Sequence, residues 1–179
     1  MTKTVKEKLE LLEKIAYHFN IENVEWVLGA SMLLYFKDII DEFHDIDLMI
    51  SNDDVTKMKN ILLEMCEILV PCENEDSIYR TKKFMEFIID GIDVNVMAGL
   101  AIIYEGKLYD CSLSKDQIVE RIYLGTELIP LQSLQLWCKY YHLMGRNEKV
   151  KMIENIISRK WVNIMTHSCG IKENEVHSK

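Results

Sequence analysis

The first part of the chain switches between helical and strand-like spacing of its apolar residues. Residues 3–19 place apolar side chains on one face at three- and four-residue intervals, which predicts an amphipathic helix. A short apolar run over 25–28 is typical of a strand, and the alternation over 45–50 predicts a second strand. A short helix capped by Ser31 is expected between the two strands, and a longer helix over about 55–67 after them.

The middle of the chain carries a hairpin signal. Asp90-Gly91 separates the apolar runs 84–89 and 92–97, which predicts two antiparallel strands joined by a two-residue turn. A second hairpin is expected around Gly106. The middle of the chain therefore adds strands rather than helices.

The last third is expected to be mainly helical. A short helix is predicted over 115–123, and Pro130 precedes a longer one over 131–145 that ends at Gly145. A final helix is predicted over 147–158.

These elements predict an α/β (α+β) fold, in which a small mixed β-sheet with flanking helices is followed by C-terminal helices. A chain of 179 residues suits one domain with an extension. The expected parts are a core domain over 1–112, a helical C-terminal extension over 113–165 packed on it, and a flexible tail over 166–179.

Composition narrows the function classes. The formal net charge of −8 repels phosphate backbones, so a nucleic-acid partner is not expected, whereas a metal ion or a cationic small molecule is favoured. No apolar run approaches the roughly 20 residues that span a bilayer, and the N-terminus lacks the apolar segment of a signal peptide. Five cysteines without CxxC spacing indicate reduced thiols. We therefore expect a cytoplasmic protein without a membrane partner.

Two carboxylates stand out in the second predicted strand. Asp45 and Asp47 are two residues apart, so they point to the same face of the strand. Like charges this close repel each other unless a cation compensates them, and Mg²⁺ prefers oxygen ligands. The alternative is a solvated strand end with incidental acids.

A glycine turn upstream adds a second signal. Gly29 ends the first predicted strand, where the backbone can approach a ligand closely. Ser31 offers a hydroxyl group, and the N–H groups at a helix start can bind phosphate. A candidate phosphate site therefore precedes the candidate metal site.

These motifs and their spacing resemble those of a known group. Gly29-Ala30-Ser31, a gap of 13 residues and then Asp45-Ile46-Asp47-Leu48 are similar to the signature of the DNA polymerase beta-type nucleotidyltransferase superfamily. The residues around Asp45 resemble those of small bacterial lincosamide and aminoglycoside nucleotidyltransferases. Later segments follow the family's order: residues 91–97, Ile129-Pro130, Lys139 and Gly145-Arg146. The resemblance spans about residues 24–158.

The resemblance implies an activity and a ligand set. Mg²⁺ would bridge Asp45, Asp47 and the phosphates of ATP or another nucleoside triphosphate, with Gly29 and Ser31 around the phosphates. A nucleoside monophosphate would then pass to a hydroxyl group of a small-molecule acceptor, such as an antibiotic, or of a protein.

A cationic stripe supports a nucleotide site in the C-terminal part. The helix over 131–145 carries Lys139 on the face opposite its apolar residues, and Arg146 continues this stripe. The resemblance implies that Lys139 contacts the triphosphate, and Arg146 is a second candidate. The alternative is an ordinary solvated helix face.

One position departs from the family's pattern. The resemblance implies a third carboxylate at position 95, where this chain has Asn95, a neutral amide and a weak Mg²⁺ ligand. Asp93 lies on the same strand face, and a two-residue turn places Glu86 directly across from Asn95. Either acid is a candidate for the missing one, or both decorate a solvated hairpin.

Asn95 also motivates a second interpretation. The chain would then be a catalytically weak or inactive nucleotidyltransferase-fold protein that binds a nucleotide or a protein partner. The family includes members that act in toxin–antitoxin pairs.

Overall fold

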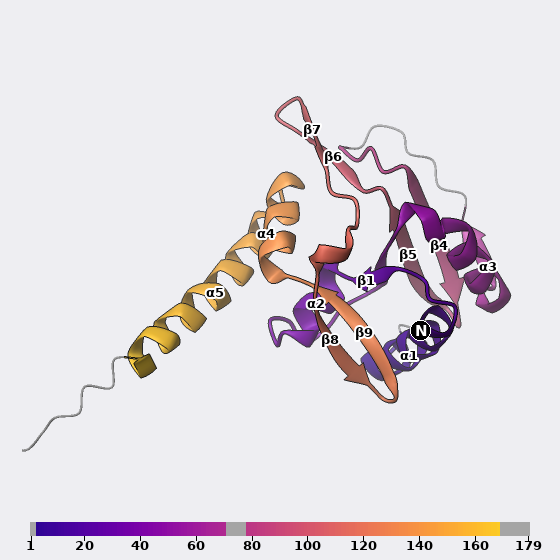
Figure 1. Ribbon diagram of the computed structural model, residues 1–179, viewed down its shortest axis with the longest axis horizontal. Coiled ribbons are helices and arrows are strands. Elements are labelled where there is room, and N and C mark those ends of the chain that lie inside the picture. The colour runs from indigo at the N-terminus through magenta and orange to yellow at the C-terminus, as the bar shows by residue number, and fades with distance from the viewer. Residues whose placement is uncertain (1–2, 71–77, 169–179) are drawn as a thin grey trace, which may run out of the picture.

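A computed structural model describes residues 3–70 and 78–168, with side chains up to residue 159. A seven-stranded mixed sheet has the order β3-β4-β5-β2-β1-β9-β8, and β6 pairs with β7 in a separate hairpin (Figure 1). The strands are β1 (Trp26–Leu28), β2 (Ile46–Ile50), β3 (Ile68–Val70), β4 (Lys83–Ile89), β5 (Ile92–Ala98), β6 (Ala101–Tyr104), β7 (Lys107–Asp110), β8 (Ile118–Leu124) and β9 (Glu127–Gln132). The helices are α1 (Val5–Ile21), α2 (Ala30–Phe36), α3 (Val55–Met65), α4 (Leu134–Leu143) and α5 (Asn147–Ser168).

Helix α1 forms where the apolar spacing predicted a helix. Thr4 and Glu7 form a capping box, which satisfies free N–H groups at the helix start. Its apolar face, with Leu12 and Ile15 fully buried, belongs to the core, and α1 contacts both β9 and α3. The predicted mixed α/β architecture is confirmed.

The hairpin between β4 and β5 has the predicted register. Asp90 and Gly91 adopt φ values of 52° and 70°, the left-handed conformations that a two-residue turn of this type requires. Ile89 pairs with Ile92, and the register continues to the pair of Glu86 and Asn95.

Strand β2 has a neighbour of each orientation. It runs antiparallel to β1 and parallel to β5. The parallel register pairs Asp47 with Asn95. Two segments far apart in the sequence therefore bring their polar residues together at the centre of the sheet.

The predicted helix over 115–123 is wrong. Only 115–117 forms a short 3-10 turn, and β8 then pairs with β9 across a turn at Gly125, where φ is 58°. Ile122 and Leu124 are half-buried while Tyr123 between them is exposed, which is the two-residue period of a strand. The pairing with β9 outweighs the local helical signal.

The C-terminal part differs from its expected outline. Residues 113–165 are not helical throughout, because β8 and β9 extend the main sheet past residue 112. The division into domains there remains a prediction. Helix α4 packs against α5, which extends beyond its expected end at 158 and projects away from the sheet (Figure 1). The predicted tail lies outside the described residues from 169 onward.

Among the described residues, no helix combines the length and the apolarity needed to cross a membrane.

Candidate active site

Three polar side chains meet where β2 and β5 lie side by side. The Nδ2 atom of Asn95 donates hydrogen bonds to Asp45 Oδ2 at 3.0 Å and to Asp47 Oδ1 at 3.1 Å. Asp47 lies in β2, and Asp45 comes directly before this strand. All three residues are half-buried. The amide group of Asn95 therefore bridges two converging carboxylates.

The electrostatics of this pair favour a cation. Burial, together with the charge of Asp45, raises the pKa of Asp47 to about 7, although the Asn95 hydrogen bond and the charges of Arg146 and Lys149 act in the opposite direction. A divalent cation between the two carboxylates would remove their repulsion. The carboxylate oxygens are suitable Mg²⁺ ligands, and Asn95 would add its weaker amide oxygen once its amide group rotates, so these residues fit the metal that the resemblance implies.

The bridged carboxylates form part of the wall of a cavity of about 530 Å³. This volume is within the usual range for small-molecule sites. Ser31, His44, Arg146 and Lys149 add polar groups to the wall. Much of the remaining lining is aromatic or aliphatic: Phe43, Tyr79, Phe84, Met97, Leu100, Trp137, Tyr141 and Met144.

Ala30 and Ser31 of the glycine turn line the same cavity, whereas Gly29 is not among the lining residues. Helix α2 begins at Ala30 with Gly29 as its N-cap, so the prediction that Ser31 caps this helix is wrong. Ser31 lies in the first turn, and its hydroxyl oxygen is buried without a hydrogen-bond partner among the described residues. A buried hydroxyl without a partner is costly, so this atom is suited to a ligand.

Trp137 explains why residue 29 is glycine. A Cβ atom there would lie 2.2 Å from Cζ2 of Trp137, because the indole packs directly on the backbone of Gly29. The indole Nε1 donates to Oε1 of the fully buried Gln132 at 2.9 Å. Strand β9 and helix α4 thus position the turn that carries Ser31.

A buried lysine supports the segment that leads to Asp45. Lys8 of α1 is only 5% exposed, and its Nζ donates to the carbonyl oxygen of Phe43 at 2.5 Å. The same ammonium group lies 5.3 Å from the centre of the Phe43 ring, a cation–π contact. Lys8 therefore positions the backbone two residues before Asp45.

Two cations border the cavity near the carboxylates. Arg146 follows α4, and its guanidinium carbon lies 6.0 Å from the centre of the Tyr141 ring. Lys149 follows in the first turn of α5. Both residues line the cavity together with Asp45 and Asp47, so both are available to an anionic ligand bound there.

Comparison with known proteins gives the fold. No family model matches the sequence, and a search of curated proteins finds no match. Among solved structures, a putative nucleotidyltransferase from Thermotoga maritima is similar with a TM-score of 0.65 and 26% identity, over 90% of this chain and 96% of that chain. The aminoglycoside-modifying ANT(2")-Ia, solved with adenylyl-2"-tobramycin, has a TM-score of 0.59 and 10% identity over 90% and 96%. The lincosamide adenylyltransferase LnuA, solved with lincomycin, has a TM-score of 0.56 and 13% identity over 87% and 99%.

This chain has the nucleotidyltransferase fold. The predicted resemblance to this superfamily is thereby confirmed. The two antibiotic-modifying proteins are too distant in sequence to show more than the fold.

Neither candidate for the missing third carboxylate is part of the cavity wall. Glu86 lies across from Asn95 in the register but does not line the cavity, and Asp93 is exposed. Within residues 3–70 and 78–159, no group of three acidic, histidine or cysteine side chains gathers to hold an ion. The catalytic role of either acid remains a prediction.

The two predicted cationic site residues differ in their position relative to the cavity. Arg146 lines the cavity, but Lys139 is exposed and does not, so its contact with a nucleotide remains a prediction. Lys149 was not among the site residues predicted from the sequence, although it lies in the first turn of α5, three residues after Arg146. Lys8 was not predicted either, because a single lysine in an amphipathic helix carries no signal for burial.

Proposed function

We propose that this chain transfers a nucleoside monophosphate from a nucleoside triphosphate to a hydroxyl group of a small acceptor molecule. The observation that carries the proposal is the pair Asp45 and Asp47, held together by Asn95 on the wall of a cavity that Arg146 and Lys149 also line. ATP is the first candidate donor, since two similar structures are described by adenylyl chemistry.

In this proposal the cavity residues have two roles, metal binding and phosphate binding. Asp45 and Asp47, with the amide oxygen of Asn95, would hold Mg²⁺, which when bound neutralises phosphate charge. Arg146 and Lys149 would bind phosphate oxygens, and the unpartnered hydroxyl of Ser31 would donate to another. The α-phosphorus would then accept the acceptor's oxygen, and its bond to the pyrophosphate oxygen would break.

The transfer also requires a base that takes the proton of the acceptor hydroxyl group. The acceptor hydroxyl must lose its proton, and neutral Asn95 cannot take it. Glu86 or Asp93 would act only if the bound complex brought one of them to the hydroxyl. The second candidate function is therefore nucleotide binding with weak or no turnover, including use as a module that binds a protein partner, and Asn95 is the observation that favours it.

Calorimetric titration tests the proposal. ATP, GTP, CTP and UTP are titrated with and without Mg²⁺ into the wild type and into Asp45→Asn/Asp47→Asn. Asp53→Asn, an exposed acid outside the cavity wall, is the control. Mg²⁺-dependent binding that only the double variant loses supports the site. The absence of binding to every nucleotide would refute it.

Release of pyrophosphate then separates the two candidates. Binding with pyrophosphate release in the presence of an acceptor supports the transferase. Tight binding without release, for the wild type and with every acceptor offered, supports the binding protein.

A further inference from the structure

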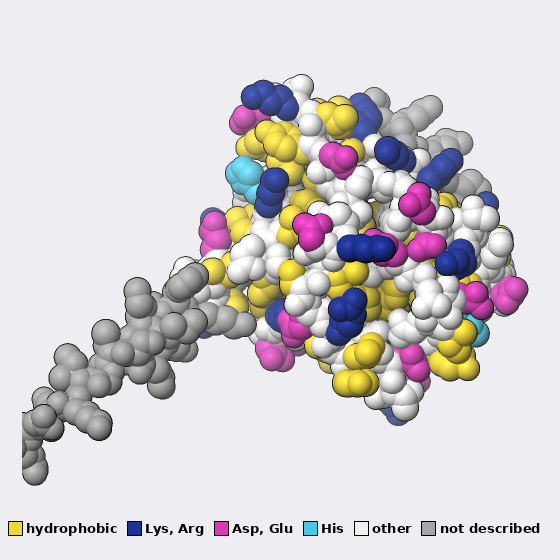
Figure 2. All heavy atoms as spheres, in the orientation of Figure 1, with side chains coloured by type: hydrophobic (Ala, Val, Ile, Leu, Met, Phe, Trp, Pro, Cys, Tyr) yellow, Lys and Arg dark blue, Asp and Glu magenta, His cyan; other side chains and the backbone are white. Residues whose placement is uncertain are grey.

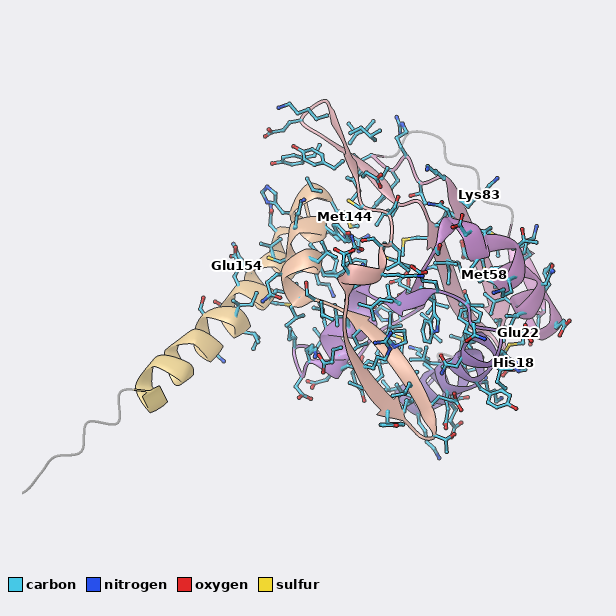
Figure 3. All side chains as sticks on the ribbon, in the orientation of Figure 1. His18, Glu22, Met58, Lys83, Met144 and Glu154 are labelled. Atoms are coloured by element: carbon cyan, nitrogen blue, oxygen red, sulfur yellow. The ribbon has the colours of Figure 1, made fainter. Side chains whose placement is uncertain are left out.

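The cavity wall beyond the carboxylates is apolar. Met97 lies two residues after Asn95, so both side chains project from the same face of β5. Phe84 is the direct cross-strand partner of Met97 and also lines the cavity. Leu100 and Met144 extend this surface; Met144 lies at the C-terminal end of α4, where Figure 3 labels it. An apolar wall therefore begins next to the proposed reaction centre.

The charges on this wall do not suit a polycation. Its acids are Glu42, Asp45 and Asp47, and a bound Mg²⁺ would neutralise the last two. Of the described lining residues, Glu42 would then be the one acid left for an amine-rich acceptor, because Arg146 and Lys149 bind the phosphates in the proposed function. Figure 2 shows acidic and basic side chains intermixed over the visible face, without a continuous acidic patch. The net charge of −8 therefore does not describe the cavity.

We propose that the acceptor is an uncharged molecule with an apolar body and a hydroxyl group, bound against Phe84, Met97 and Met144. This inference rests on the proposed function, and it replaces the cationic acceptor that the net charge favoured. The apolar body gains free energy by leaving water. Contact with Met97 and its neighbours directs the hydroxyl group toward Asn95 and the paired carboxylates.

Binding of 2-naphthylmethanol, a neutral apolar alcohol, tests the proposal against tobramycin, a polycation. Each is titrated into protein saturated with Mg²⁺ and ATP. The variants Met97→Gln and Met144→Gln keep side-chain length but make the wall polar, and Met152→Gln on exposed α5 is the matched control. We expect 2-naphthylmethanol to bind the wild type, each wall variant to weaken it by about fivefold or more, and the control to leave it unchanged.

Two variants and a separate ATP titration keep the outcomes distinct. The acceptor proposal is overturned if tobramycin binds more tightly, if neither wall variant changes the affinity, or if 2-naphthylmethanol fails to bind. Competition between 2-naphthylmethanol and ATP would also overturn it, because the apolar wall would then bind the nucleobase. Failure of ATP to bind the wild type would instead refute the proposed function.

Discussion

Asn95 Nδ2 lies 3.1 Å from Asp47 Oδ1, and the two residues are paired across the parallel strands β5 and β2. The same nitrogen also reaches Asp45. A neutral donor thus partly offsets the repulsion of two carboxylates that lack a cation. A carboxylate at position 95 would have the opposite effect.

The variant Asn95→Asp should therefore depend on Mg²⁺ for stability. Without the ion, a third negative charge against Asp45 and Asp47 should destabilise the fold by about 1–4 kcal/mol. With saturating Mg²⁺, most of this loss should be recovered. Thermal unfolding with EDTA and with Mg²⁺ measures both states, and Asp93→Asn, at an exposed position of the same strand, is the control. Equal stabilisation of the wild type and Asn95→Asp by Mg²⁺ would contradict the placement of the ion.

The raised pKa of Asp47 predicts a pH-dependent stability in EDTA. Burial and the charge of Asp45 raise this pKa from its ordinary value of 3.8 to about 7 in the folded protein. The folded protein therefore holds a proton that the unfolded chain releases at lower pH, so this stabilisation is full below about pH 4 and is lost as pH rises through about 7. Urea unfolding from pH 4 to pH 8 measures the loss. Asp47→Asn should not show it, and a wild type that is equally stable across this range would argue against a protonated Asp47.

The sequence predicted the parts of this site that follow from local rules. The turn at Asp90 and Gly91 fixes the hairpin register, because few residue pairs adopt two successive positive φ values. The two-residue spacing of Asp45 and Asp47 places them on one face of a strand. Neither inference needs knowledge of the rest of the fold.

The remaining parts depend on contacts between distant segments. The glycine at position 29 makes room for Trp137, more than a hundred residues away, so its meaning could not be read locally. Lys139 and Lys149 are both helical cations, and only the packing of α4 and α5 decides which one lines the cavity. Strand β8 forms because β9 lies beside it, which outweighs the helical signal there.

The contact between Lys8 and Phe43 predicts a role for α1 in metal binding. Lys8→Met keeps the length of the side chain but leaves the Phe43 carbonyl without its donor, which costs about 1–3 kcal/mol, while loss of a buried charge offsets part of this. Stability alone is therefore a poor test. The affinity for Mg²⁺ and ATP should fall severalfold, because Asp45 lies only two residues after Phe43. The variant Lys8→Arg should restore part of this affinity. Lys6→Met, at an exposed surface ion pair, is the control. An unchanged affinity in Lys8→Met would show that Phe43 holds its position without this lysine.

Lys139, Arg146 and Lys149 are the cations for which the structure and the sequence pattern predict different effects on nucleotide binding. Arg146 and Lys149 line the cavity and act on Asp47, whereas Lys139 is exposed and does not line it. Substitution of Arg146 or Lys149 by glutamine removes one charge from the nucleotide's surroundings, and a hydrogen bond to a charged phosphate contributes about 1.5–3 kcal/mol. Each variant should therefore bind ATP with Mg²⁺ about tenfold more weakly or worse. Lys139→Gln removes the same charge from the solvated face and should change the affinity by less than about twofold.

Calorimetry on the three variants at one salt concentration makes the comparison. If Lys139→Gln lost as much affinity as Arg146→Gln, the nucleotide would have to lie along the outer face of α4 rather than in the cavity beside Asp47.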